Sequence, residues 1–180
     1  MNTEDRIKAA WQGRISGCLL GKPVEMISMR EGPQGLHRFL EDSGSLPLRN
    51  YVNYMEHELL RGVNKKCCSG MMDKAEVDDD ITYLVLALMM METYGLDLST
   101  DDVARTWINM LPVGATFTAE RDSYLKLIEK SNMAYQFGGP RSFDLDEIND
   151  GEYNDWIGAQ IRIDMYLSLI HISEPTRRYR

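Results

Sequence analysis

The stretch that decides the fold class is residues 76–95, with the sequence EVDDDITYLVLALMMMETYG. Three adjacent aspartates at 78–80 precede a segment that is apolar on every face from residue 83 to residue 91. Such a segment, closed by Gly95 in the position that glycine favours just after a helix, predicts a buried helix. We therefore predict a central helix over residues 81–94, with acidic residues at its N-terminus.

Apolar residues recur at helical spacing on both sides of this segment. The first helix is expected to be capped by Thr3 and ended by Pro23. Further helices are expected at residues 101–110, with Ser99 or Thr100 as the cap, at 118–130, and from about 152. Residues 61–72 and 131–150 are expected to be loops. No stretch alternates with period two over a convincing length, so the predicted class is all-α.

Glycines recur every fourth residue in the first helix, at Gly13, Gly17 and Gly21. Each costs roughly 1 kcal/mol in a helix interior relative to alanine. The repeated cost predicts that another backbone or a ligand comes close to this face.

Composition limits the classes of function. The chain has 180 residues, is 43% hydrophobic and carries a formal net charge of −8. The negative charge argues against a nucleic-acid backbone or an anionic membrane as the main partner. The longest apolar run is about half of the ~20 residues that a spanning helix needs. The polar N-terminus lacks the features of a secretory signal, so a cytoplasmic location is expected.

The aspartates Asp78, Asp79 and Asp80 are the first candidate site. Adjacent carboxylates repel one another in a dry site, and a bound divalent cation removes that cost. The alternative is simple capping of the helix by acidic residues. Glu25, which follows a proline, is a second candidate, because a carboxylate near a metal can orient or deprotonate water. The alternative for Glu25 is a surface residue in a loop.

The segment from Trp156 to Asp164 is the third candidate. Gly158 allows close approach, and Gln160 and Arg162 have side chains that can hydrogen-bond to phosphate or ribose oxygens. The alternative is an amphipathic packing helix with its polar residues directed outward.

Taken in order, four segments resemble the ADP-ribosylglycohydrolase family, and most closely its bacterial branch. They are GRISGCLLGKPVE at 13–25, EVDDDITY at 76–83, TAER at 118–121 and WIGAQIRID at 156–164. The resemblance spans roughly residues 6–166.

This resemblance implies an orthogonal helical bundle with a two-metal site, usually magnesium, with manganese as an alternative. It implies hydrolysis of the glycosidic bond of an ADP-ribosyl group on a protein or small molecule. Glu25 matches an acidic residue that contacts metal and attacking water. Asp79 and Asp80, or Asp78 and Asp79 after a shift of one residue, match the family's paired aspartates. Gly158 and Arg162 match the family's later substrate segment, which in this chain also holds Gln160 and Asp164.

The chain departs from the family in one respect. No Asp-x-Asp-Ser/Thr motif, which completes the family's metal site, follows Asp164. Residues 167–180 change abruptly in character and are expected to be a non-native tail after an incomplete domain at 1–166. We therefore expect this chain by itself to have little or no activity.

Two other classes of function remain open on the sequence. One is a non-catalytic module that binds ADP-ribose or metal. The other is an all-α nucleotide pyrophosphohydrolase, which also uses acidic residues on helices. The released products distinguish them, since a glycohydrolase releases ADP-ribose, a pyrophosphohydrolase releases AMP and a binding module releases nothing.

Overall fold

The computed structural model describes residues 2–153, 156, 158 and 160–163. These residues contain helices and no strand, and an isolated parallel bridge joins Asn53 to Ser69. The predicted all-α class is therefore confirmed. The chain divides into two compact units, Met1–Ile81 (unit 1) and Thr82–Arg180 (unit 2).

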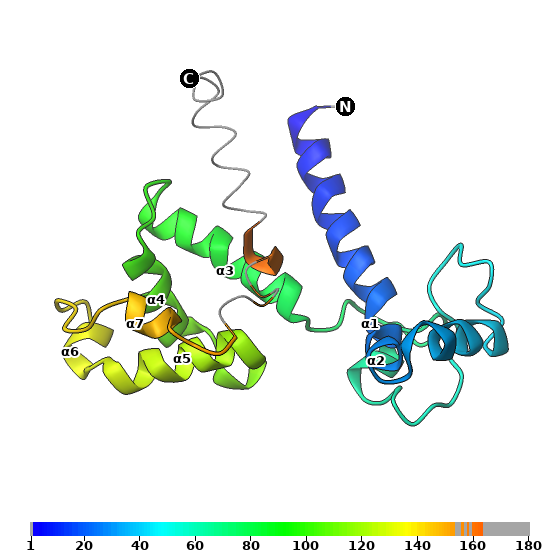
Figure 1. The fold of residues 1–180 in the computed structure, drawn as a ribbon. Helices are drawn as coiled ribbons and strands as arrows, with labels where there is room; N and C mark the ends of the chain where they lie inside the picture. The colour runs from blue at the N-terminus through cyan, green and yellow to red at the C-terminus, as the bar shows by residue number, and fades with distance from the viewer. Residues whose placement is uncertain (1, 154–155, 157, 159, 164–180) are drawn as a thin grey trace, which may run out of the picture. The chain divides into compact units, whose positions relative to one another are not determined.

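The helices follow one another as labelled in Figure 1. They are α1 (Thr3–Asp42), α2 (Val63–Lys66), α3 (Asp79–Tyr94), α4 (Thr100–Met110), the 3-10 turn η1 (Val113–Ala115), α5 (Thr118–Lys130), α6 (Met133–Gln136) and α7 (Asp146–Asn149). The boundary between the units falls within the first turn of α3, so the aspartates belong to unit 1. No helix among the described residues is both long enough and apolar enough to cross a membrane.

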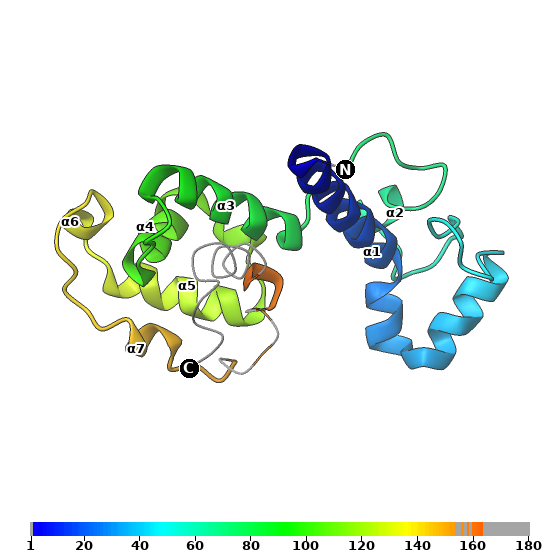
Figure 2. The ribbon, with the colours of Figure 1, turned by 90° about the horizontal axis from the view of Figure 1, so that it is seen from above.

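Helix α1 differs from its prediction at both ends. Asn2 is the N-cap, because its side chain accepts the Asp5 N–H at 2.8 Å. Pro23 does not end the helix but lies buried within it. A proline in a helix loses one backbone hydrogen bond, and here the burial of its ring offsets part of that loss. The interruption occurs instead at Gly32, whose φ of 70° only glycine adopts readily, and Pro33 starts the next turn. Figure 2 shows the change in direction along α1.

The core of unit 1 joins the second half of α1 to the segments that follow it. Ile27 and Phe39 of α1 pack with Val52, Leu60 and Cys68. Local hydrogen bonds hold the residues that follow α1. For example, the side-chain amide of Asn53 donates to the carbonyl oxygens of Ser43 and Gly44. The stretch 61–72, predicted as loop, contains the single turn α2.

The core of unit 2 is formed by α3, α4, α5 and the segments that follow them. Its buried members are Tyr83, Leu86, Ala104, Trp107, Leu111, Tyr124, Leu127, Tyr135 and Ile148. Helix α5 packs against α4 and α7, and α6 packs against α4. The predicted bounds of α5 are confirmed. The predicted loop at 131–150 contains the one-turn helices α6 and α7.

The prediction that α3 is buried on every face was wrong. Its buried residues include Leu84 and Met90, whereas Val85 and Leu88 are exposed. Its C-terminal end agrees with the sequence, because Gly95 has a φ of 84° and donates its N–H to the Met91 carbonyl. Helix α4 also begins as predicted, with a reciprocal capping box between Ser99 and Asp102.

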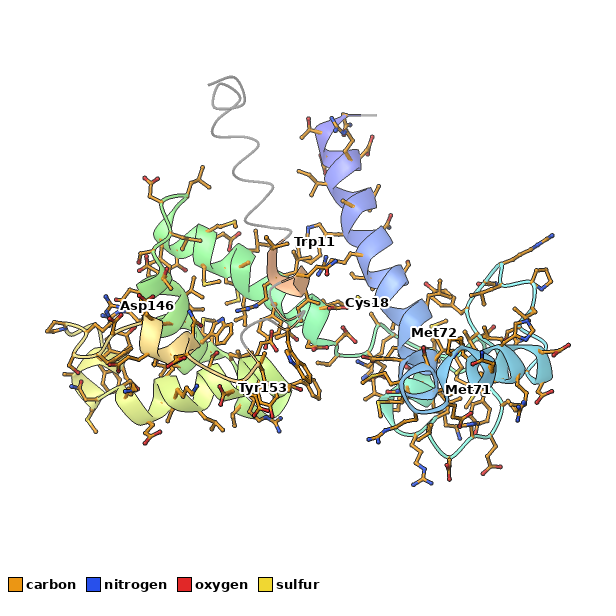
Figure 3. The ribbon with its side chains drawn as sticks, in the orientation of Figure 1. Trp11, Cys18, Met71, Met72, Asp146 and Tyr153 are labelled. Atoms are coloured by element: carbon orange, nitrogen blue, oxygen red, sulfur yellow. The ribbon has the colours of Figure 1, made fainter. Side chains whose placement is uncertain are left out.

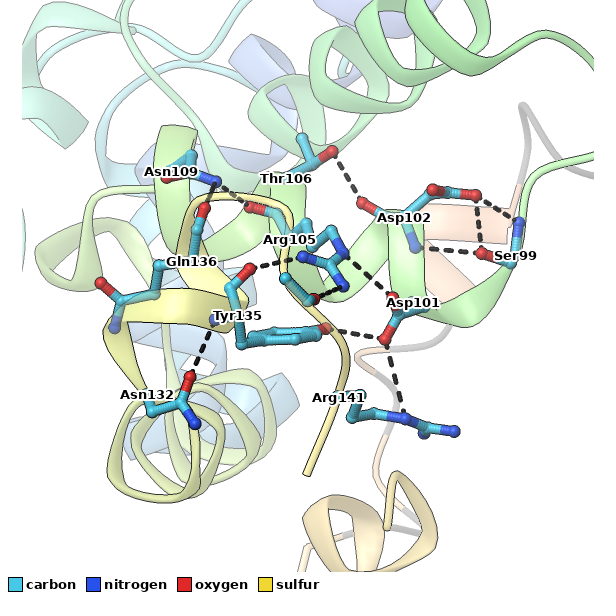
Figure 4. Close-up of polar contacts among 11 residues, drawn as sticks. Ser99, Asp101, Asp102, Arg105, Thr106, Asn109, Asn132, Tyr135, Gln136 and Arg141 are labelled. Atoms are coloured by element: carbon cyan, nitrogen blue, oxygen red, sulfur yellow. Dashed lines mark hydrogen bonds and ion pairs between the residues drawn. The ribbon is translucent and has the colours of Figure 1, made fainter. Parts of the chain in front are cut away.

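A polar network ties α4 to α6 (Figure 4). Arg105 donates from Nε to Asp101 at 3.0 Å and from Nη2 to the Gly139 carbonyl at 2.8 Å, and its other terminal nitrogen donates to the Tyr135 carbonyl. The buried Tyr135 hydroxyl donates to Asp101 at 2.9 Å. One guanidinium thereby donates to two backbone carbonyls and one carboxylate, and so joins α4 to the α6 segment.

Candidate functional site

The acidic segment meets one face of α1 within unit 1. Among the described residues, Cys18, Asp78 and Asp80 form a group whose ligand atoms all lie within 4.8 Å of one another. Figure 3 labels Cys18 on α1. Asp78 is only 8% exposed, although it carries a charge. Two carboxylates at this separation can share one cation.

Three residues of α1, spaced four apart, reach this segment. Arg14 donates to the Asp80 carbonyl at 3.3 Å, and the Cys18 thiol donates to Asp80 Oδ2 at 3.5 Å. The Lys22 ammonium forms a hydrogen-bonded ion pair with Asp78 Oδ2. Residues four apart lie on one face of a helix, so the register of α1 brings all three to the acidic segment.

The charges at the site affect its titrating groups. Partial burial raises the pKa of the Cys18 thiol to about 11, and the carboxylates of Asp80 and Asp78 add to the rise. Burial opposes the charge on Lys22, but the hydrogen bond to Asp78 prevails and raises the pKa of Lys22. Burial, followed by repulsion from Asp78, raises the pKa of Asp79. At neutral pH the thiol is therefore protonated and the amine is charged.

The structure distinguishes the three aspartates. Asp78 caps α3, since its Oδ1 accepts the Asp80 N–H at 3.0 Å. Asp78 therefore caps the helix, as the alternative interpretation of the aspartates expected. It is also one of the three residues that could bind a cation. The group contains Asp78 and Asp80, whereas both pairings expected from the sequence include Asp79. Asp78 precedes the first residue of α3 as its cap, so its side chain is not bound to the helical spacing that separates Asp79 and Asp80.

Glu25 is exposed on α1 and lies outside this group. It is close enough to Lys22 to favour the charged amine. No protein group lies close to the glycine face among the described residues, because a Cβ added at Gly13, Gly17 or Gly21 would meet nothing within 4 Å. The approach of a ligand to this face stays a prediction. The polar contacts of α1 come from the face that holds Arg14, Cys18 and Lys22 instead.

The residues present fit a hard divalent cation in part. The two carboxylates supply oxygen ligands of the kind that Mg²⁺ and Mn²⁺ prefer. The protonated Cys18 thiol does not suit these ions as a ligand, and its position suits a hydrogen-bond donor that orients Asp80. Lys22 already offers a positive charge to Asp78, so an added cation has to compete with it.

The predicted substrate segment lies in unit 2. Arg162 donates from Nε to the Gly158 carbonyl at 2.9 Å and lies 3.8 Å from Glu120 Oε1. Its guanidinium is 5.2 Å from the centre of the Trp107 ring, within cation–π range. Gln160 is exposed, and Asp164 and the tail at 167–180 lie outside the described residues.

The expected close approach at Gly158 is present, and Glu120 is the group that approaches. A Cβ added at Gly158 would lie 1.6 Å from Glu120 Oε1, so any other residue at this position would displace the carboxylate from where it lies. The sequence analysis did not propose a role for Glu120, Cys18 or Lys22. The spacing of four among Arg14, Cys18 and Lys22 was the signal available for the last two.

Comparison of the chain with models of protein families, with curated proteins and with solved structures found no match.

Proposed function

We propose that the protein is a magnesium-dependent hydrolase that acts on the glycosidic bond of an ADP-ribosyl group. The observation that carries the proposal is the pair of carboxylates, Asp78 and Asp80, brought within reach of one cation at the start of α3. The four segments that resemble the ADP-ribosylglycohydrolases support the choice of substrate. The same resemblance supports an orthogonal bundle as the architecture. A location in the cytoplasm is part of the same proposal.

A bound magnesium ion would supply a source of hydroxide near neutral pH and a positive charge that stabilises developing negative charge. Asp78 and Asp80 would hold the ion. Cys18 would keep Asp80 oriented through its hydrogen bond. Arg14 would fix the backbone at Asp80. The site therefore depends on the register of α1 as much as on the acidic segment.

Glu25 is proposed as the residue that orients or deprotonates the attacking water. Glycosidic hydrolysis passes through an oxocarbenium-like state, which a nearby carboxylate also stabilises. Glu25 follows Lys22 on α1 by three residues and is open to solvent.

The first prediction concerns metal binding. Titration calorimetry with MgCl₂ should detect a weak site, with a Kd on the order of 1 mM. Asp78→Asn/Asp80→Asn should abolish the heat, while the exposed Asp97→Asn should leave it unchanged. Lys22→Met should tighten binding about tenfold, because it removes the competing charge from Asp78. If the aspartates only cap α3, none of these changes will alter the heats.

The second prediction concerns the reaction. An ADP-ribosylated protein is incubated with Mg²⁺ and either this chain or the same chain joined to whatever its gene encodes after codon 166. Free ADP-ribose should appear with the extended chain, and Glu25→Gln should lower its turnover about 10²-fold. Chromatography separates ADP-ribose from AMP. Release of AMP would identify a pyrophosphohydrolase, and metal binding with no product from either chain would indicate a binding module.

A further inference from the structure

Unit 2 contains a cavity that lies outside the proposed metal site. Its volume is about 420 Å³, within the range of small-molecule sites. Buried apolar side chains of α4, α5 and α7 line it, among them Trp107, Leu127 and Ile148. Tyr153 and Trp156 add two more aromatic rings, which contact each other edge to face with their centres 5.0 Å apart. The walls therefore suit a flat aromatic ligand.

Glu120 lines the same cavity and is only 7% exposed. Its Oε1 has no hydrogen-bond donor among the described residues. A buried carboxylate oxygen without a donor is costly, and such atoms are rare in folded proteins. A ligand that brings an N–H group into the cavity would supply the missing donor.

The charges beside Glu120 restrict the ligand further. Arg162 also lines the cavity and lies 3.8 Å from Glu120 Oε1, so the carboxylate and the guanidinium together carry no net charge. A cationic ligand would be attracted by Glu120 but repelled by Arg162, and the reverse holds for an anionic ligand, so neither charge is favoured overall. A neutral ligand meets neither repulsion. It can still donate a hydrogen bond to the carboxylate, and such charge-assisted bonds are the stronger kind.

We propose that this cavity, in unit 2, binds a neutral planar aromatic molecule through an N–H group donated to Glu120, with Trp107, Tyr153 and Trp156 as the aromatic walls. The site stands independently of the metal site in unit 1, because all of its residues lie in Thr82–Arg180. Glu120 gives the specificity for a donor, and the aromatic walls give the specificity for a flat ring.

The test uses indole as the probe and 1-methylindole as the matched ring without a donor. Binding to the full chain is followed by NMR through the side-chain N–H signals of its three tryptophans. Trp107 and Trp156 line the cavity, whereas Trp11 belongs to α1 and serves as an internal control. We expect indole to shift the first two signals with a Kd on the order of 1 mM. We expect 1-methylindole to bind about tenfold more weakly.

Two variants complete the test. Glu120→Met keeps the size of the side chain and removes the acceptor, so it should make the two probes bind equally. Glu129→Met, at an exposed position on the same helix, should preserve the tenfold preference. Equal binding of the two probes to the unaltered chain would overturn the proposal, as would shifts of all three tryptophan signals alike. If Glu120→Met unfolds unit 2, the probe pair on the unaltered chain still decides the matter.

Discussion

The two units bury their cores in different ways. In unit 2, helices of 11 to 16 residues pack directly on one another, and their apolar stripes meet in a single core. In unit 1, a kinked helix of 40 residues packs against largely irregular chain, and its core is Ile27 and Phe39 against Val52, Leu60 and Cys68. Helical periodicity therefore explains most of unit 2 and less of unit 1.

The polar contacts differ in the same way. In unit 2 the contacts of Arg105 cross from α4 to the α6 segment and satisfy backbone carbonyls. In unit 1 the corresponding long-range contacts run from α1 to the acidic segment and involve Asp78 and Asp80. The first set holds the fold together, and the second positions the groups that could bind a cation.

The largest expected effect comes from removing core side chains. Leu127→Ala in unit 2 and Ile27→Ala in unit 1 should each lower the free energy of unfolding by about 2–5 kcal/mol, because both residues are buried. Leu125→Ala, also on α5 but 52% exposed, should cost less than about 1 kcal/mol. Urea denaturation monitored by circular dichroism measures all three. A small loss for Ile27→Ala would mean that the irregular core of unit 1 contributes little.

A somewhat smaller effect is expected from the α4–α6 network. Arg105→Met should cost about 2 kcal/mol, because it removes the donor to the Gly139 carbonyl, one of two donors to the Tyr135 carbonyl and the nearer of two cations at Asp101. Lys126→Met, which removes the ion pair with Asp122 near the surface, should cost below about 1 kcal/mol. If thermal melting shows the same loss of stability for both variants, the network around Arg105 contributes no more than an ordinary surface ion pair.

The smallest effect concerns pH. Burial, and then the hydrogen bond to Asp101, raises the pKa of Tyr135 to about 12, above the ordinary value of 10.0. The folded state therefore holds this proton where the unfolded state has lost it. The stabilisation is complete below pH 10 and is lost as the pH rises toward 12. Tyr135→Phe should lower stability at neutral pH and flatten its decline between pH 10 and 12 in denaturant titrations. If stability falls with pH as steeply in Tyr135→Phe as in the unaltered chain, other groups, such as Cys18 and Cys68, cause the decline.

The local features of the sequence predicted much of unit 2. The Ser99 cap, the bounds of α5 and the terminating Gly95 all depend on a few neighbouring residues, and all three are confirmed. The end of the first helix was predicted wrongly, because the cost of Pro23 within a helix is a local rule that burial in the core can outweigh.

By itself, the sequence determined the helical class, because the apolar spacing is 3.6 rather than two along most of the chain. It also placed three carboxylates at the start of α3. Only the tertiary structure decided which of them come together, because the choice of Asp78 and Asp80 depends on Cys18 and Lys22, some 60 residues earlier in the chain. Only the tertiary structure likewise placed Glu120 beside Gly158 and Arg162, since contacts between distant segments follow from packing and leave no periodic trace in the sequence.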